Sequence, residues 1–385
     1  MSQVNSFTRD EVLSKINSID RNKSSFIGNL HDVTDWEIGD GKFDLTLDGE
    51  TYHFGPHAQS QLLKKLRIPR AYFDICSKDL RDQELREGFE TLERGAENRF
   101  KFWYNPETQE KTIYGFIPKN CEDILPSQII EKVFDGMGAL NNVFTNQCYH
   151  TLVQIRLRIV DPNFNFSTIS NDELFPMVDV IFSDVLTTPI KVQSGLYRKV
   201  CSNGMVVPVE LNNAFTMPLT RYREDLFNQH IQYVNDSASR LDVISKAFIE
   251  LKQIELPEAL IDADKDERNS FDEVFEYVIP RKPDRGDIDV LVRNKFNTAE
   301  EHNVFGLINA VTATVREWSG GDMDPNKQLI EESVGNFITR VAIQEQNRGF
   351  TYNKESLDDL FKKKKKFRAV NVNSMPTMQT PTTTA

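Results

Sequence analysis

Alternating apolar and polar positions predict strands in the first half of the chain. In KFDLTLDGETYHF (residues 42–54), Asp48-Gly49 fits the tip of a two-residue hairpin turn. A turn of that length pairs Leu45 with Tyr52, so both side chains fall on one face. The pattern therefore predicts an antiparallel hairpin over residues 43–54.

Further alternating runs extend the β-rich region. RFKFWY and KTIYGFI predict a second hairpin, over residues 99–117, with its turn beginning at Asn105-Pro106. The longest run is TLVQIRLRIVD, in which Arg156 and Arg158 fall on the face opposite the aliphatic residues. PMVDVIFSDV and TPIKVQ predict two more strands.

A third hairpin is predicted over residues 196–210, in LYRKVCSNGMVVPVE. Asn203-Gly204 lies between two β-rich runs and fits a type I′ tip, where both central residues need positive φ. On that interpretation, Gly204→Val should destabilise the protein, because a β-branched residue is strained at positive φ.

Helical periodicity replaces the strand pattern after Pro218. Strands first and helices afterwards predict an α+β fold, with an antiparallel β-sheet in the N-terminal half, a helical C-terminal half and a flexible basic tail. We expect residues 1–217 to form a β-rich α+β domain. Residues 218–349 should form a helical region packed on it, and residues 350–385 the tail.

Net charge is unevenly distributed along this chain of net charge -12. Residues 350–385 contribute seven cations and three carboxylates, or +4, which leaves -16 on residues 1–349. An acidic body repels nucleic acid in general. Phosphate contact therefore requires a local basic patch.

Other features indicate a cytoplasmic protein. No run approaches the roughly 18 apolar residues of a membrane span, and the start lacks the apolar core of a signal peptide. We expect no membrane association. Four scattered cysteines without a CxxC pair predict reduced structural thiols and no zinc site; they are Cys76, Cys121, Cys148 and Cys201.

DADKDERNSFDE (residues 262–273) has the acidic spacing of a calcium loop. Glu267 stands where that loop needs a glycine for its sharp turn. We therefore interpret the segment as an acidic linker and expect neither metal nor cofactor, so millimolar calcium should not raise the melting temperature.

Two segments resemble a family of phage and plasmid-like proteins, catalogued as domain of unknown function 932. GLYRKVCSNGMVV resembles that family's R-x-x-C-[ST]-N-G signature, and NVFGLINAVTATVREW resembles its later W-G-x-x-N-A-V-T-E-Y helix. LLKKLRIPRAYFDIC likewise resembles its L-G-I-P segment, and the likeness spans roughly residues 55–320. The resemblance implies origin on a mobile element and establishes no activity.

Two groups of cations are candidate binding residues in the β-rich half. Arg156 and Arg158 could form a basic stripe on a sheet that binds single strands, or pair with nearby acids. The family-signature hairpin could grip a phosphate or a partner loop, or serve only as a turn. Its distinctive residues are Arg198, Lys199, Cys201, Asn203 and Gly204.

The segment FKKKKKFR is the clearest functional feature of the sequence. Its six cations are Lys362, Lys363, Lys364, Lys365, Lys366 and Arg368. Such runs bind nucleic acid or acidic surfaces, and six single-strand phosphate contacts imply a salt slope of roughly -4. Truncation after Leu360 should leave the melting temperature nearly unchanged.

These features favour a non-enzymatic accessory protein of a phage or plasmid. It would bind single- or double-stranded nucleic acid without sequence specificity, in DNA metabolism or recombination. The alternatives are a counter-defence protein that binds a host protein, or an enzyme whose site is assembled from residues far apart in sequence. No catalytic residue can be assigned, and the oligomeric state is not indicated.

Overall fold

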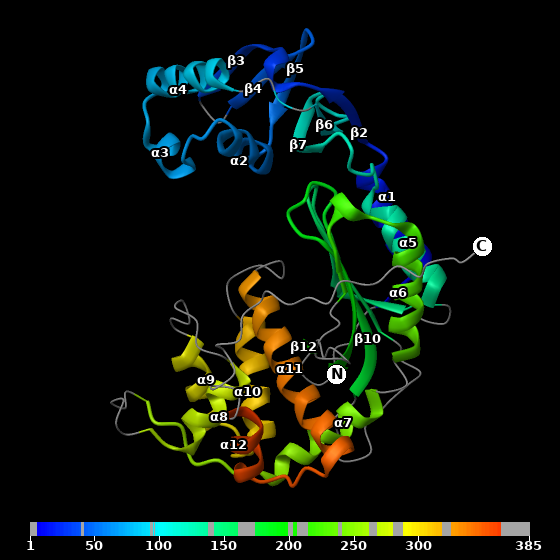
Figure 1. Cartoon of the computed structure of the whole chain (residues 1–385), viewed down its shortest axis with the longest axis vertical. Helices are drawn as coiled ribbons and strands as arrows, with labels where there is room; N and C mark the ends of the chain where they lie inside the picture. The colour runs from blue at the N-terminus through cyan, green and yellow to red at the C-terminus, as the bar shows by residue number, and fades with distance from the viewer. Residues whose placement is uncertain are drawn as a thin grey trace, which may run out of the picture. The chain divides into compact units, whose positions relative to one another are not determined.

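The computed structural model is drawn in Figure 1. Its chain divides into two compact units. Unit 1 comprises Met1–Ser245 with Trp318–Gly335, and unit 2 comprises Lys246–Glu317 with Asn336–Ala385. The structure describes residues 6–39, 42–92, 95, 97–137, 142–160, 174–198, 203–205, 215–237, 241–261, 268–279, 288–317 and 325–362.

The first sheet of unit 1 has six described strands in the order β2-β6-β7-β5-β4-β3. Their bounds are β2 Lys23–Gly28, β3 Val33–Gly39, β4 Lys42–Leu47, β5 Glu50–Phe54, β6 Asn98–Tyr104 and β7 Lys111–Pro118. The predicted hairpin over 43–54 is confirmed: Leu45 pairs with Tyr52, and Asp48 and Gly49 have φ of 49° and 79°. The second hairpin, β6 with β7, is also confirmed. Among the described strand pairs of this sheet, β5–β7 is parallel and the others are antiparallel.

Three helices accompany this sheet: α2 (Pro56–Lys65), α3 (Arg70–Ile75) and α4 (Lys78–Thr91). Pro56 starts α2 at a position where its missing N–H costs nothing. The Leu-rich face of α2 packs with the inward residues of β4, β5 and β7 in one hydrophobic core. The period-2 strand pattern and the 3.6-residue helix pattern thus bury the same core.

The second sheet of unit 1 follows the order β1-β8-β9-β10-β11-β12, and β13 also pairs with β11. Its strands are β1 Ser6–Thr8, β8 Asn142–His150, β9 Ile155–Val160, β10 Leu174–Phe182, β11 Ile190–Arg198, β12 Asn203–Met205 and β13 Phe215–Met217. Helices α1 (Arg9–Asp20), α5 (Pro126–Met137) and α6 (Glu224–Ser237) share a core with this sheet. Thr8 and Glu11 form a capping box at the start of α1.

The antiparallel pairing of the third predicted hairpin is confirmed, but its predicted tip is wrong. Arg198 pairs with Asn203 and Tyr197 with Gly204, so Asn203-Gly204 belongs to strand β12. The connection comprises residues 199–202 and, with Lys199 and Cys201, lies outside the described residues. The proposed strain of Gly204→Val at a turn tip therefore loses its basis.

Unit 2 is helical in its described part. It contains α8 (Ser270–Val278), α9 (Ile288–Asn297), α10 (Val304–Glu317) and α12 (Lys354–Lys362). Helix α7 (Leu241–Glu250) begins in unit 1, and α11 (Pro325–Arg348) contributes residues 325–335 to unit 1 and 336–348 to unit 2. Several aromatic side chains contribute to the core, with Phe271, Phe275, Phe296, Phe305 and Phe337 all buried.

The α+β prediction is confirmed, with strands in the first half and helices in the second. The units divide the chain differently from the expected boundaries at 217/218 and 349/350, since α6 belongs to unit 1. The expected tail also begins with an ordered helix, α12. Within the described ranges, no helix is long and apolar enough to cross a membrane.

Candidate functional site

Helix α12 fixes the start of the basic segment onto unit 2. Leu357 is buried, and the Phe361 ring stacks on Tyr277 and Phe337 with centroid distances of 5.1 Å and 5.0 Å. Tyr277 also donates a hydrogen bond to Asp358 at 2.9 Å. These contacts anchor the chain up to the residue before the lysine run.

Lys362, the first cation of the lysine run, already has carboxylate partners. Its Nζ lies 2.9 Å from Asp358 and 3.8 Å from Glu273. Lys354 contacts the same two carboxylates at 2.9 Å and 2.5 Å. Lys363, Lys364, Lys365, Lys366 and Arg368 lie outside the described residues.

The prediction of a solvent-facing basic stripe at Arg156 and Arg158 is wrong. Arg156 is 3% exposed and Arg158 is 7% exposed, and Asp179 forms ion pairs with both. Arg156 Nη2 is 2.9 Å from Asp179, which faces Arg158 across the β9–β10 pair. Glu331 of α11 adds contacts of 2.8 Å to Arg156 and 2.5 Å to Arg158. The arginine face is therefore covered by a helix from far along the chain.

Charge complementarity stabilises the ionised forms in this cluster. Burial would raise the pKa of Asp179, but the two guanidinium groups outweigh it and hold the pKa below its ordinary value. Burial would likewise lower the pKa of Arg156, and the carboxylates of Asp179 and Glu331 raise it instead. Both charges persist inside the protein because each is paired.

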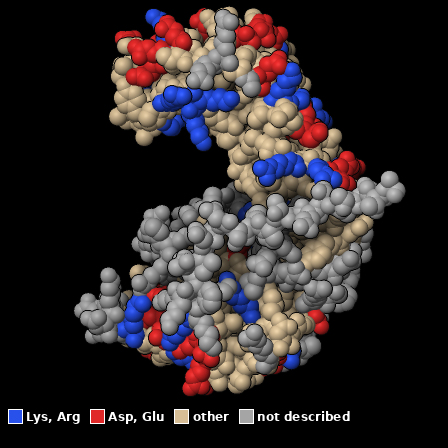
Figure 2. Space-filling view, viewed as in Figure 1, with Lys and Arg blue, Asp and Glu red and all other residues tan. Residues whose placement is uncertain are grey.

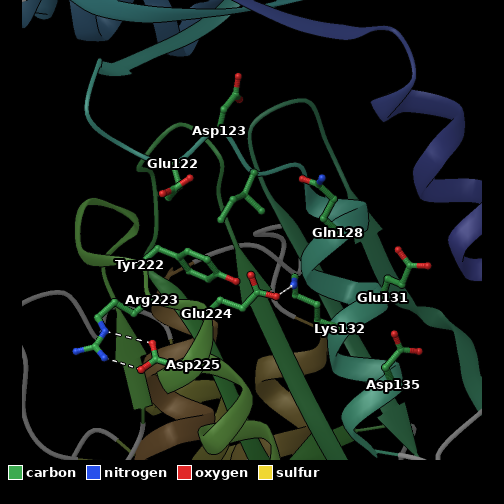
Figure 3. A pocket seen from close by; sticks show the side chains of 11 residues that line it. Glu122, Asp123, Gln128, Glu131, Lys132, Asp135, Tyr222, Arg223, Glu224 and Asp225 are labelled. Atoms are coloured by element: carbon green, nitrogen blue, oxygen red, sulfur yellow. Dashed lines mark hydrogen bonds and ion pairs between the residues drawn. The ribbon is translucent and has the colours of Figure 1, made fainter.

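A surface pocket of about 720 Å³ opens between the starts of α5 and α6 (Figure 3). Six carboxylate residues and two cationic residues are part of its lining: Glu122, Asp123, Glu131, Asp135, Glu224 and Asp225, with Lys132 and Arg223. Excess negative charge disfavours phosphate at this place. Carboxylates at a helix start also complement the helix dipole.

The pocket carboxylates do not converge on a common point. In Figure 3 Glu224 reaches Lys132, while Asp225 pairs with Arg223 at 2.5 Å. Asp135 is engaged by Arg9 at 2.5 Å. The arrangement therefore provides no acid–base pair around a shared substrate position.

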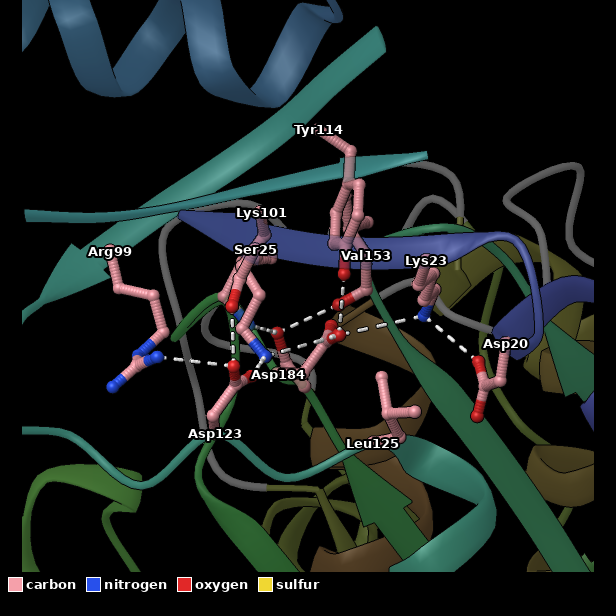
Figure 4. A network of polar contacts seen from close by, with 12 residues as sticks. Asp20, Lys23, Ser25, Arg99, Lys101, Tyr114, Asp123, Leu125, Val153 and Asp184 are labelled. Carbon is pink, nitrogen blue, oxygen red and sulfur yellow. Dashed lines mark hydrogen bonds and ion pairs between the residues drawn. The ribbon is translucent and has the colours of Figure 1, made fainter. Parts of the chain in front are cut away.

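A buried polar network, missed by the sequence analysis, lies where the two sheets of unit 1 meet (Figure 4). Asp184, which follows β10, accepts a hydrogen bond from Tyr114 Oη at 2.8 Å. Its Oδ2 also lies 3.5 Å from Lys23 Nζ and 4.0 Å from Lys101 Nζ. Lys101 in turn pairs with Asp123, which faces the pocket. The network therefore connects strands β2, β6 and β7 to the second sheet.

Burial dominates the electrostatics of this network. It raises the pKa of Asp184 despite the two neighbouring ammonium groups, and it raises that of Tyr114. His150 Nε2 lies 3.5 Å from Asp20, and burial lowers its pKa to about 4. Lys23 Nζ and Asp184 Oδ1 form no hydrogen bond with the described groups around them. No sequence signal could have joined Lys23 to Asp184, because 160 residues separate them.

Groups of three or more potential metal ligands do not occur among the described residues. The acidic segment 262–267 lies outside that part of the chain. Glu273, at the last position of the tested calcium spacing, lies on α8 and is engaged by Lys354.

Comparison of the chain with family models, curated proteins and solved structures finds no match. The resemblance to the phage and plasmid-like family accordingly stays a prediction.

Proposed function

We propose that the protein binds nucleic acid without sequence specificity, through the phosphate backbone. The observation that carries this proposal is the anchored start of the lysine run. Phe361 fixes the chain on unit 2, and five cations follow Lys362 without an intervening acid. A compact polycation of this kind displaces counterions from a polyanion.

The charge distribution favours binding through local basic segments. Residues 363–385 carry five cations and no carboxylate, which leaves -17 on residues 1–362. Because Asp358 and Glu273 already neutralise Lys362, we count five phosphate contacts where the sequence alone indicated six. The buried Arg156 and Arg158 are not among them.

The biological setting rests on the family resemblance of residues 55–320. That resemblance supports origin on a phage or plasmid, and in that setting we propose an accessory role in DNA metabolism or recombination. Binding to a host protein is the alternative, since an acidic body suits a basic partner. An enzyme has less support, because the carboxylates of the described pocket do not converge.

Fluorescence anisotropy with an oligothymidylate of about 20 nucleotides across a salt series tests the proposal. Replacing Lys363, Lys364, Lys365, Lys366 and Arg368 by Gln should reduce the slope of log affinity against log salt by about 3.5, from about 0.7 per phosphate. A matched control exchanges Lys and Arg at these five positions and should keep the slope. An unchanged slope in the Gln variant would refute the tail contact. Absence of any binding at low salt would leave the host-protein partner ahead.

A further inference from the structure

A second group of cations lies on unit 1, at the corner where α2 ends and α3 begins. Lys64 and Arg67 are exposed, and neither side chain has an ion pair or hydrogen bond with another described residue. Arg70 is also exposed and contacts Asp74 at 2.8 Å. We call Lys64 and Arg67 the corner pair. Figure 2 shows Lys and Arg side chains gathered along the edge where α2 and α3 lie.

The backbone holds the corner pair together. Arg67 N–H donates to Lys64 O at 3.2 Å, and Ile68 N–H donates to Leu63 O at 2.8 Å. These two bonds form the Schellman motif that closes α2, with Arg67 at the position that glycine usually occupies. Arg67 has φ of 62°, in the left-handed region that favours glycine.

A left-handed arginine is an unfavourable choice for a helix end. A non-glycine residue at positive φ is strained, and such strain concentrates at functional positions. Lys64 complements the dipole at the end of α2, as any cation in the last turn would. That explanation does not extend to Arg67, because a glycine would close the helix without strain.

Packing on both sides of Arg67 directs its side chain outward. Leu66 and Ile68 are buried, and their side chains lie against Gly88 of α4. Residues 56–81 carry six cations and two carboxylates within a chain of net charge -12. The corner therefore presents unneutralised positive charge on an otherwise acidic protein.

We propose that the corner pair contacts phosphates of the bound nucleic acid, in addition to the contacts made by the basic tail. This inference rests on the proposed function and assigns part of the contact to a folded element of unit 1. Exposed cations of this kind contact phosphates and read no bases.

The test combines substitutions of the corner pair with those of the tail, in the full-length chain. Lys64→Gln with Arg67→Gln should reduce the salt slope by about 1.4 for the same oligothymidylate, both in the wild type and in the tail variant with five Gln. Arg86→Gln is the matched control. Arg86 is an exposed residue of α4 without a described partner, two positions from Gly88 and so on the opposite side of that helix. It should leave the slope unchanged.

Charge and local structure are separated by two further variants. Arg67→Lys should retain the slope, whereas Arg67→Gly should reduce it by about 0.7 without lowering the melting temperature. A corner variant that keeps the wild-type slope, while the tail variant loses its share, would overturn the corner contact and leave the proposed function intact. A tail variant with unchanged slope would refute the tail contact instead, and absence of any binding at low salt would overturn the proposed function.

Discussion

Two basic pairs of unit 1 lie in opposite environments. Arg156 and Arg158, the strand pair, are buried on β9 against Asp179 and Glu331. The corner pair is exposed at the end of α2 and has no partner among the described residues. Both pairs are two cations close in sequence, so their roles follow from what covers them.

The difference indicates which charges stabilise the fold and which remain available to bind a ligand. A buried ion pair is costly to form, but removing one partner leaves an uncompensated charge inside the protein. An exposed cation contributes little to stability and keeps its full charge for a ligand. Substitutions at the strand pair should therefore change stability, and those at the corner pair should change binding.

Asp179→Asn is expected to have the largest effect. It removes the charge that faces both arginines and should lower the free energy of unfolding by about 3–5 kcal/mol in urea denaturation at neutral pH. Asp225→Asn is the control, because the Arg223–Asp225 pair is exposed and should contribute at most about 1 kcal/mol. A loss below about 1 kcal/mol at Asp179 would contradict the interpretation.

Lowering the pH should also remove the contribution of Asp179 to stability. The folded pKa of Asp179 lies below its ordinary value, so its contribution is complete above that ordinary value and is lost as pH falls through the folded pKa. The wild type should therefore lose stability more steeply below about pH 4 than Asp179→Asn does. Parallel curves would show that the pKa of Asp179 is not lowered in the folded protein.

His150 should produce the next largest effect, also through burial. Its pKa is lowered from 6.5 to about 4, mainly by burial, with Asp20 opposing and with Lys23 and Lys15 reinforcing the shift. Between these values the unfolded chain binds a proton that the folded chain does not. Stability should thus fall by about 3 kcal/mol as pH decreases from 7 to 4.

The variant His150→Gln should lose this pH dependence when unfolding is followed at several pH values. Burial also lowers the pKa of His57, so His57→Gln is a useful comparison that should leave the His150 contribution in place. If the stability of His150→Gln depends on pH as that of the wild type does, the pKa of His150 is not lowered in the folded protein.

The two pairs also show what a sequence can predict. The β4–β5 hairpin, including its register, followed from residues that are neighbours in the chain. Alternation correctly put Arg156 and Arg158 on one face of β9, but it could not tell that Glu331, 173 residues beyond Arg158, covers that face. Asn203-Gly204 misled because pairing begins at Asn203 itself, so the residues before it make the connection. The buried Lys23–Asp184 contact had no local pattern at all.

Two truncations at the end of α12 should have different effects on stability and on binding. Truncation after Lys362 should remove the tail's share of the salt dependence, about 3.5 in slope, and leave stability unchanged. Truncation after Leu360 also removes Phe361 and should cost about 1–2 kcal/mol, because its stacks on Tyr277 and Phe337 are lost. This replaces the sequence-based expectation of an unchanged melting temperature. Equal melting temperatures for the two truncations would show that Phe361 does not anchor the helix.

The smallest expected effect concerns the backbone at Arg67. Arg67→Gly and Arg67→Ala both remove the cation, so they should weaken binding equally. They should differ in stability, because alanine keeps the strain of the left-handed conformation and glycine does not. The strain of about 1–2 kcal/mol is partly offset by the greater freedom of glycine in the unfolded chain, about 0.5–1 kcal/mol. Arg67→Gly should therefore be more stable than Arg67→Ala by up to about 1.5 kcal/mol in urea denaturation. If alanine proves equally stable, the left-handed arginine is not strained, and the argument that its retention reflects binding loses its main support.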